Sequence, residues 1–261
     1  MARAVALAGK VTLHKSLDAA AAANKLLWSY IMTTVSNGMK LSTETLEVLK
    51  NFASLNSNIL VKPGNRITTV TPIKNVLAEA QVAETFETEF GIWDLNKFLG
   101  TVSLFDDPEL EFEDKYMNIK GGRSSVKYFY CEPNLLTTTD KSVPVNDVVV
   151  EFELSEKVFS DVMRAASVLS LSDLAITNEG DTLCLKVFDK ADTGSNNYTV
   201  ELGDLPHGDH DFDFHFKVET LKLMQGDYDV AITKNTVSRF THKGRDLTYY
   251  VALERTSSYK A

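Results

Sequence analysis

The stretch Leu41-Ser42-Thr43-Glu44-Thr45-Leu46 contains a complete signal for the start of a helix. Ser42 is a favoured N-cap residue, and Leu41 and Leu46 occupy the two positions of a hydrophobic staple. Glu44 places a negative charge in the first turn, where the helix dipole favours it. Apolar residues continue at helical spacing to about residue 56. The stretch therefore predicts a short amphipathic helix that begins beside Ser42.

Short strands and a second helix are predicted after this first helix. The predicted strands cover residues 58 to 61, 66 to 72, 76 to 88, 109 to 112, 117 to 120 and 125 to 130. The second helix is expected from residue 92 to about residue 105, because its apolar residues recur every three or four positions. Residues 136 to 146 contain Pro144 and several Thr and Ser residues. That composition predicts an extended connector.

The pattern then repeats. Leu154-Ser155-Glu156-Lys157-Val158-Phe159 restates the cap and staple of the first helix at an offset of 113 residues. A fourth helix is expected after Phe216, because Phe216, Val218, Leu221 and Gly226 match Phe90, Ile92, Leu95 and Gly100 at an offset of 126. Solenoid repeats are much shorter than this period. The sequence therefore predicts an α+β fold of two duplicated domains.

The charge of the chain limits how it can bind nucleic acid. The net charge is −9, from 27 basic and 36 acidic residues. Residues 1 to 38 hold four basic residues and one acidic residue, which leaves 23 and 35 for the remainder and a net charge of −12 there. An acidic body excludes binding of nucleic acid over the whole surface. Any contact with DNA must be a local basic patch.

Several other features narrow the class of protein. Cys131 and Cys184 form no C-x-x-C pattern, so we expect two thiols in a reducing compartment and no disulfide bond. The longest apolar runs near the N-terminus are too short to cross a bilayer. The order of charged and apolar residues there does not fit a signal peptide. We therefore expect neither a membrane span nor secretion.

Several short segments between residue 39 and about residue 257 have a distinctive order and spacing: Met39-Lys40-Leu41-Ser42, Leu49-Lys50-Asn51-Phe52-Ala53, Asp94-Leu95-Asn96-Lys97-Phe98-Leu99-Gly100, Ser103-Leu104, Leu174-Ala175-Ile176-Thr177, Gly226-Asp227-Tyr228 and Tyr250-Val251-Ala252-Leu253-Glu254. Together they resemble the sliding clamp of T-even-type bacteriophages, the DNA polymerase processivity factor. The resemblance does not include the Ala-rich residues 1 to 38.

The resemblance implies a ring with no catalytic residues and no cofactor. In such a clamp, three identical subunits with two clamp-type domains each encircle duplex DNA; short helices line the hole and antiparallel sheets form the outer wall. The implied partners are a clamp loader, the replicative DNA polymerase and late-transcription factors, in the cytoplasm of an infected bacterial host. We expect domain 1 at residues 39 to 136, a connector at 137 to 146 and domain 2 at 147 to 261. Residues 1 to 38 are expected to be an extension outside the folded clamp.

A clamp must attract phosphates without reading bases, because base contacts would stop it from sliding. Long cationic side chains on the pore helices suit that need. The basic residues expected to face DNA on the four predicted helices are Lys50, Lys97, Lys157, Arg164, Lys217 and Lys222. Lys50, Arg164 and Lys222 also match basic positions of the family's pore helices. The alternative is a solvated helix face that binds nothing.

Clamps bind short hydrophobic peptides beside the connector, so the resemblance implies a pocket for partner proteins there. The candidates are three residues of the connector and three near the C-terminus: Val143, Pro144, Val145, Tyr250, Val251 and Leu253. Strand alternation means that some of the last three must face the core. The alternative is that all six simply pack against their neighbours.

The segment from His207 to His215 is the main candidate for a metal site, because it contains His207, Asp209, His210, Asp211, Asp213 and His215. However, Phe212, Phe214 and Phe216 alternate with the last polar residues, which predicts a half-buried strand with a polar outer face. We therefore expect no metal. A metal-dependent phosphodiesterase that uses this cluster remains one alternative function, and a module for protein interaction alone is the other.

Overall fold

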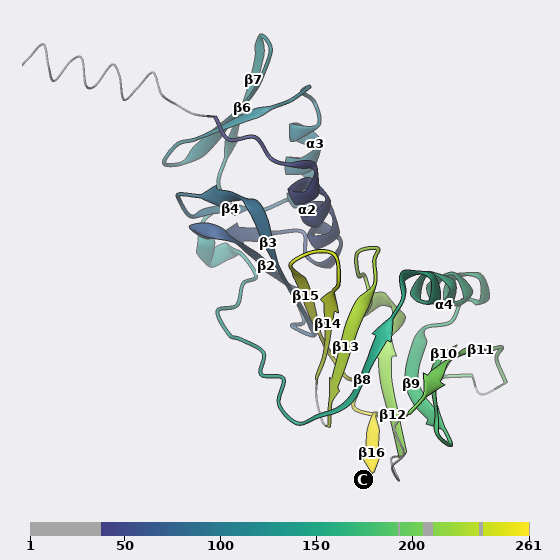
Figure 1. Cartoon of the computed structure of the whole chain (residues 1–261). Coiled ribbons are helices and arrows are strands. Elements are labelled where there is room, and N and C mark those ends of the chain that lie inside the picture. Colours follow the sequence, from purple (N-terminus) through teal and green to yellow (C-terminus); the bar gives the residue numbers. More distant parts are fainter. Residues whose placement is uncertain (1–37, 193, 206–210, 235–236, 261) are drawn as a thin grey trace, which may run out of the picture.

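The computed structural model describes residues 38–192, 194–205, 211–234 and 237–260, so the expectation for residues 1–37 lies outside the described part. We use the name domain 1 for the elements from α2 to β7, labelled as in Figure 1. In chain order they are α2 (Thr43–Leu55), β1 (Ile59–Val61), β2 (Gly64–Val70), β3 (Val76–Phe86), β4 (Phe90–Ile92), α3 (Leu95–Val102), β5 (Glu109–Phe112), β6 (Tyr116–Gly121) and β7 (Ser124–Phe129).

A 3-10 turn, η1 (Pro133–Leu135), leads into a connector without regular structure, and domain 2 begins with β8. Domain 2 consists of β8 (Val148–Leu154), α4 (Glu156–Leu169), β9 (Asp173–Glu179), β10 (Thr182–Phe188), β11 (Tyr198–Asp204), β12 (Asp211–Lys217), η2 (Val218–Thr220), β13 (Tyr228–Thr233), β14 (Val237–His242), β15 (Leu247–Ala252) and β16 (Ser258–Lys260). No helix of the described residues is both long enough and apolar enough to span a bilayer.

The two predicted cap residues start their helices as expected. The side chain of Ser42 accepts a hydrogen bond from the Thr45 N–H, and that of Ser155 accepts one from the Val158 N–H. The prediction of a second helix near residue 92 is also confirmed, although α3 begins only after Asp94, whose side chain caps it. Polar N-caps satisfy N–H groups that the helix itself leaves unpaired. Local sequence therefore fixed the start of each of these helices.

The prediction of a fourth helix after Phe216 is wrong. The chain forms only the 3-10 turn η2, and residues 221–227 are not helical. Domain 1 has residues 93–108 between β4 and β5 for a helix, whereas domain 2 has only residues 218–227 between β12 and β13. Thr220 matches the N-cap Asp94 at the offset of 126, but its hydroxyl donates to the Lys217 carbonyl and caps nothing. Leu221 still occupies the core, as its match Leu95 does.

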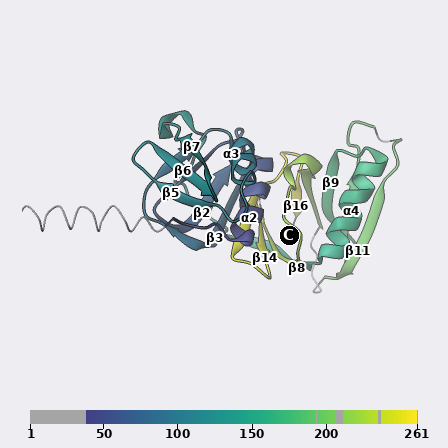
Figure 2. The ribbon, with the colours of Figure 1, turned by 90° about the horizontal axis from the view of Figure 1, so that it is seen from above.

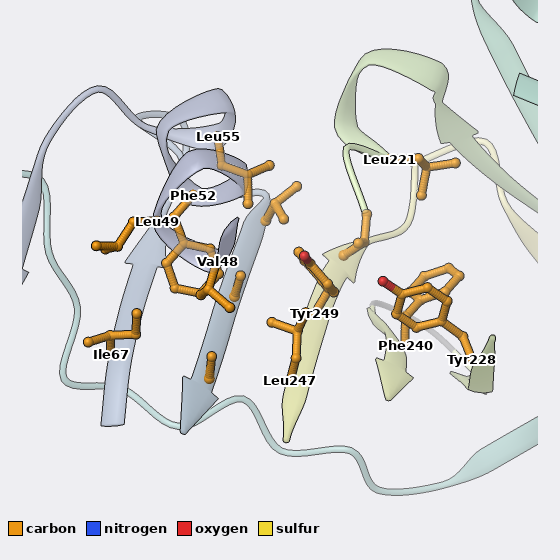
Figure 3. Close-up of a cluster of buried hydrophobic side chains, with 14 of the residues drawn as sticks. Val48, Leu49, Phe52, Leu55, Ile67, Leu221, Tyr228, Phe240, Leu247 and Tyr249 are labelled. Atoms are coloured by element: carbon orange, nitrogen blue, oxygen red, sulfur yellow. The ribbon is translucent and has the colours of Figure 1, made fainter. Parts of the chain in front are cut away.

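One antiparallel sheet crosses the junction between the domains. Its strand order is β2-β3-β15-β14-β13-β8, and β15 pairs with β3 from Leu247↔Ala80 to Val251↔Val76. The buried side chains of both domains form a single core, in which Tyr249 lies between the α2 residues and the Tyr228–Phe240 pair (Figure 3). A second sheet, β11-β10-β9-β12-β16, lies in domain 2 and carries α4 across β10 and β11. The two domains are therefore joined by both a sheet and a core.

The strand pairing confirms the duplication. In domain 1 β1 pairs with β4, and in domain 2 β9 pairs with β12. The meander β5-β6-β7 corresponds to β13-β14-β15, and the bridge from Met39 to Leu110 corresponds to the pairing of β8 with β13. By this correspondence β7 is the counterpart of β15, and β11 is the counterpart of β3. Within the described residues, β7 and β11 each end their sheet with an unpaired edge.

The continuous sheet has two different faces. Ile67, Ala78 and Tyr249 point from it into the core shared with α2. Leu77 and Glu79 are on the opposite face, beside residues 139–142 of the connector. Figures 1 and 2 show α2 and α3 together on domain 1 and α4 beside β9 to β11. We call the face beside the connector the outer face.

Candidate nucleic-acid interface

Helix α4 presents two cations on one face, as its spacing predicts. Lys157 Nζ lies 2.9 Å from Asp161 Oδ2, and Arg164 Nη2 lies 2.7 Å from Asp161 Oδ1. Both cationic side chains are mostly exposed, at 87% and 70%. Val162 and Ala166 are buried on the opposite face. Lys157 and Arg164, which were both expected to face DNA, therefore share a solvent-facing surface of α4.

Asp161 is a part of this surface that the sequence analysis missed. Its carboxylate stands one turn after Lys157 and one turn before Arg164, which is the spacing at which helix side chains meet. The hydrogen bond from Lys157 lowers the pKa of Asp161, and Asp161 in turn raises the pKa of Lys157. Asp161 therefore holds both cations in place, and its negative charge partly neutralises the pair.

Two further predicted cations lie on the helices of domain 1. Lys50 is exposed on α2 and Lys97 is exposed in the first turn of α3. Among the described residues, neither ammonium group forms an ion pair or a hydrogen bond; the backbone N–H of Lys97, and not its side chain, donates to Asp94. Both charges are therefore open to solvent and to an anion.

The placement of Lys217 on a pore helix is wrong. Lys217 ends β12 and its ammonium group binds the carboxylate of Asp173, which is buried. Burial would raise the pKa of Asp173, but hydrogen bonds from Lys217, Ser172 and the Lys190 N–H outweigh it and lower the pKa. A buried carboxylate requires such a partner. The charge of Lys217 is therefore occupied within domain 2.

Lys222 also lies outside any helix, in the segment after η2. Its side chain is on the surface, but its Nζ donates to the carbonyl of Ser54, in the last turn of α2, at 3.0 Å. The prediction that Lys222 belongs to a pore helix is wrong for the same reason as the fourth helix itself. Lys222 faces the junction between the domains.

The six predicted pocket residues differ in where they lie relative to the outer face. Val251 is buried in the core, so it cannot line a pocket, and that part of the prediction is wrong. Tyr250, which precedes Val251 on β15, points to the outer face, where its hydroxyl lies 3.2 Å from Glu79 Oε1. Val143, Val145 and Leu253 are half-buried, and Pro144 is exposed. A groove of about 310 Å³ lies nearby, lined by Leu60, Lys62, Pro63, Arg66, Thr68, Leu77, Glu79 and residues 139–142.

The residues of the metal candidate are only partly described, because His207, Asp209 and His210 lie outside the described residues. Phe212, Phe214 and Phe216 are all buried on β12, which confirms the predicted strand. His215 is buried as well, contrary to the expected polar face; its Nδ1 lies 2.8 Å from Thr256 Oγ1 and its Nε2 lies 2.8 Å from Asp213 Oδ2. The described residues contain no group of three or more side chains suited to a metal. His215 therefore fastens the C-terminal segment to β12.

Comparison with known proteins places this arrangement in a family. A family model described as "DNA polymerase processivity factor" matches residues 41–143, and one described as "gp45 sliding clamp, C terminal" matches residues 151–255. The sliding clamp of Vibrio phage KVP40 is 32% identical over 221 residues, which are 83% of this chain and 99% of that protein. The sliding clamp of Enterobacteria phage T4 is 29% identical over 227 residues, 85% of this chain and 99% of that protein.

The chain belongs to the sliding-clamp family of T4-like phages. The clamp also shares its fold with PCNA of A. fulgidus, solved with the C-terminal region of FEN-1, at a TM-score of 0.58 and 14% identity, over 83% of this chain and 94% of that one. It is a DNA polymerase processivity factor with two domains of antiparallel sheets and helices, and the family is not catalytic. The phosphodiesterase alternative is therefore set aside.

Proposed function

We propose that three copies of this clamp close head to tail into a ring around duplex DNA, through pairing of β7 of one subunit with β11 of the next. The observation that carries the proposal is the pairing of β15 with β3 inside the chain. Their counterparts in the duplication, β7 and β11, have the same strand edges free at the two ends of the described molecule. A free edge is a template for a strand of another chain. Repetition of one such contact closes a ring when the rotation suits it.

Exposed apolar side chains support this assignment, because they lie at the same two ends. Phe129 on β7 is 66% exposed, and Val168 near the end of α4 is 76% exposed. Leu55 occupies the position of Val168 in α2 and is only 8% exposed. A second copy seated on α4 and β11 would bury Val168 and Tyr198 as the domain junction buries Leu55.

In this ring the DNA-facing cations are Lys50, Lys97, Lys157 and Arg164. They lie on the surfaces of α2, α3 and α4, whereas the clamp as a whole is acidic. The outer wall repels DNA, so attraction is confined to the hole and weakens with salt. Weak contacts suffice, because a closed ring cannot leave DNA sideways.

The remaining assignments follow from the family. The clamp works in the cytoplasm of an infected bacterial host, where a clamp loader places it on DNA and the replicative polymerase and late-transcription factors bind it. Tyr250, Val143, Pro144, Val145 and Leu253 form the partner surface beside the connector. The A. fulgidus PCNA structure, which holds a C-terminal region of another protein, supports docking of a peptide tail.

The domain limits of 39–136, 137–146 and 147–261 also stand as proposals, with residues 1–38 outside the folded clamp. Deletion of residues 1–38 should leave the melting temperature and the oligomer mass unchanged. A clear loss of either would show that the extension belongs to the fold.

The decisive experiment measures both the oligomer mass and the retention of the protein on circular DNA. Wild-type protein loaded on a closed circle of DNA should stay bound and should leave when the circle is cut. Phe129→Glu and Val168→Glu should yield folded monomers that are not retained, because each places a charge in the proposed interface. Ile73→Glu is the matched control, since Ile73 is 79% exposed in the turn between β2 and β3, and neither of these strands pairs with β7 or β11. Retention that survives linearisation, or trimers in both variants, would contradict the proposal.

A further inference from the structure

The segment Leu221 to Gly226 is bound to domain 1 by side chains of α2. Asn51 Nδ2 donates to the Lys222 carbonyl at 2.8 Å, and Lys222 Nζ donates back to the Ser54 carbonyl at 3.0 Å. The Tyr249 hydroxyl donates to Asn51 Oδ1 at 2.7 Å and accepts from the Met224 N–H at 3.2 Å. We call Asn51, Ser54, Lys222 and Tyr249 the junction clasp.

The clasp satisfies backbone groups that would otherwise lack partners. The last turn of a helix leaves carbonyl groups without intrahelical donors, and a positive charge there is favourable. Helix α2 has no basic residue of its own in its last turn. The cation at that end is supplied by Lys222 from the other domain. The non-helical segment is satisfied in the same way. Its Lys222 carbonyl accepts from Asn51, its Met224 N–H donates to Tyr249, and its Met224 carbonyl accepts from the Tyr228 hydroxyl at 2.7 Å.

The tyrosine side of the clasp is buried, whereas the bonds of Lys222 are exposed. Tyr249 and Tyr228 are fully buried in the core between the domains, and burial raises the pKa of both hydroxyls, so they remain donors at any physiological pH. A second contact between the domains stands nearby, where Arg245 Nη2 lies 2.7 Å from Glu47 Oε2. The clasp therefore lies beside a buried core and an ion pair that also join the two domains.

We propose that Lys222 is a positioning residue of this junction and not a phosphate-binding cation: it caps α2 from domain 2, and with Asn51 it fixes how the two domains sit together. The other basic residues of the helices differ from it, because Lys50 has no such partner among the described residues and Lys157 and Arg164 meet only a side chain of their own helix. Lys222 matches a basic position of the family's pore helices, which implied a role in binding DNA. The proposal assigns it to the domain junction instead.

Four variants of the full chain test it: Lys222→Met, Lys222→Arg, Asn51→Ala and, as a matched control, Lys50→Met on the exposed face of α2. Thermal unfolding and amide hydrogen exchange report the junction. Lys222→Met and Asn51→Ala should each lower the melting temperature by roughly 2–4 °C and speed exchange in the last turn of α2. Lys222→Arg should restore most of both, because it keeps a charged donor of similar reach. Lys50→Met should change neither.

The salt dependence of binding to a short DNA duplex separates the two roles. Each lost phosphate contact lowers the slope of log affinity against log salt by about 0.9. We expect Lys50→Met to lower the slope and Lys222→Met to leave it at the wild-type value. A lower slope for Lys222→Met overturns the proposal, and so does wild-type melting and exchange in Asn51→Ala. This second measurement rests on the proposed function, whereas melting and exchange do not; wild-type binding without salt dependence would refute the proposed DNA-facing cations and leave the clasp to be judged by melting and exchange alone.

Discussion

Glu84 of β3 binds the N-terminus of α2 from outside the helix, because its carboxylate accepts a hydrogen bond from the backbone N–H of Ser42. Its other oxygen accepts from the Thr45 hydroxyl. In a capping box, a Glu three residues after the cap bonds the N–H of the cap residue. Thr45 occupies that position here, and a strand residue far along the sequence supplies the carboxylate.

The first prediction follows from the charge of Glu84. Burial would raise the pKa of this carboxyl, but the hydrogen bonds from Thr45 and Ser42 outweigh it and lower the pKa. A carboxylate with a lowered pKa stabilises the fold above its unfolded pKa, about 4.3, and loses that effect as pH falls through the folded pKa. Glu84→Gln should cost about 1.5–3 kcal/mol at neutral pH and progressively less in acid. Urea unfolding across pH measures it, with the exposed Glu87→Gln as control. An equal cost at neutral and acid pH would contradict the assignment.

The second prediction concerns Asp161, which sits between Lys157 and Arg164. Arg164→Glu should weaken binding to DNA and lower its salt slope, because it removes a phosphate contact. Asp161→Asn should strengthen binding to DNA and raise the salt slope, since it frees both cations from their shared anion. Both variants should fold, because surface changes of this kind usually shift stability by about 0.5 kcal/mol or less. Fluorescence anisotropy with a labelled duplex across a salt series measures both; unchanged affinity in both variants would remove α4 from the pore.

The third prediction compares two glycines. Gly226 has φ +142, and a Cβ there would lie 2.2 Å from His242 Nε2. The His242 ring is held by the Gln225 carbonyl and the Gly244 N–H, so it has little room to move. Gly226→Ala should cost about 1–3 kcal/mol. Gly100 lies within α3 with open space around it, so Gly100→Ala should stabilise by about 0.5–1 kcal/mol. Chemical denaturation gives both free-energy changes. Unchanged stability in Gly226→Ala would show that the His242 ring can move aside.

The fourth prediction tests the partner surface. Tyr250→Ala and Val145→Glu should weaken binding of a polymerase C-terminal peptide, because both side chains belong to the proposed partner surface beside the connector. Titration calorimetry measures the affinity, and Leu104→Glu serves as the control, since it introduces the same charge at an exposed apolar position elsewhere. Affinity equal to that of the control would exclude these two residues from the surface.

The sequence by itself determined the features that depend on near neighbours. Ser42 and Ser155 cap their helices because a cap bonds an N–H only three residues away. The spacing of Lys157 and Arg164 placed them on one face, since helix geometry sets that angle within the helix. The alternation of Phe212, Phe214 and Phe216 revealed a strand for the same reason. The order of short segments also identified the family.

The tertiary structure decided everything that depends on pairing between distant residues. Residues 218–226 resemble the end of β4 and α3 in sequence, and this similarity predicted a helix. The segment is too short for one, and it forms a non-helical stretch bonded to Asn51 and Tyr249. Lys217 and Lys222 were predicted to be pore cations, but in the fold they bind Asp173 and the Ser54 carbonyl. No local pattern signals such pairs, because each partner lies at least 25 residues away. The free energy of a buried or capping charge depends on which group the fold brings beside it.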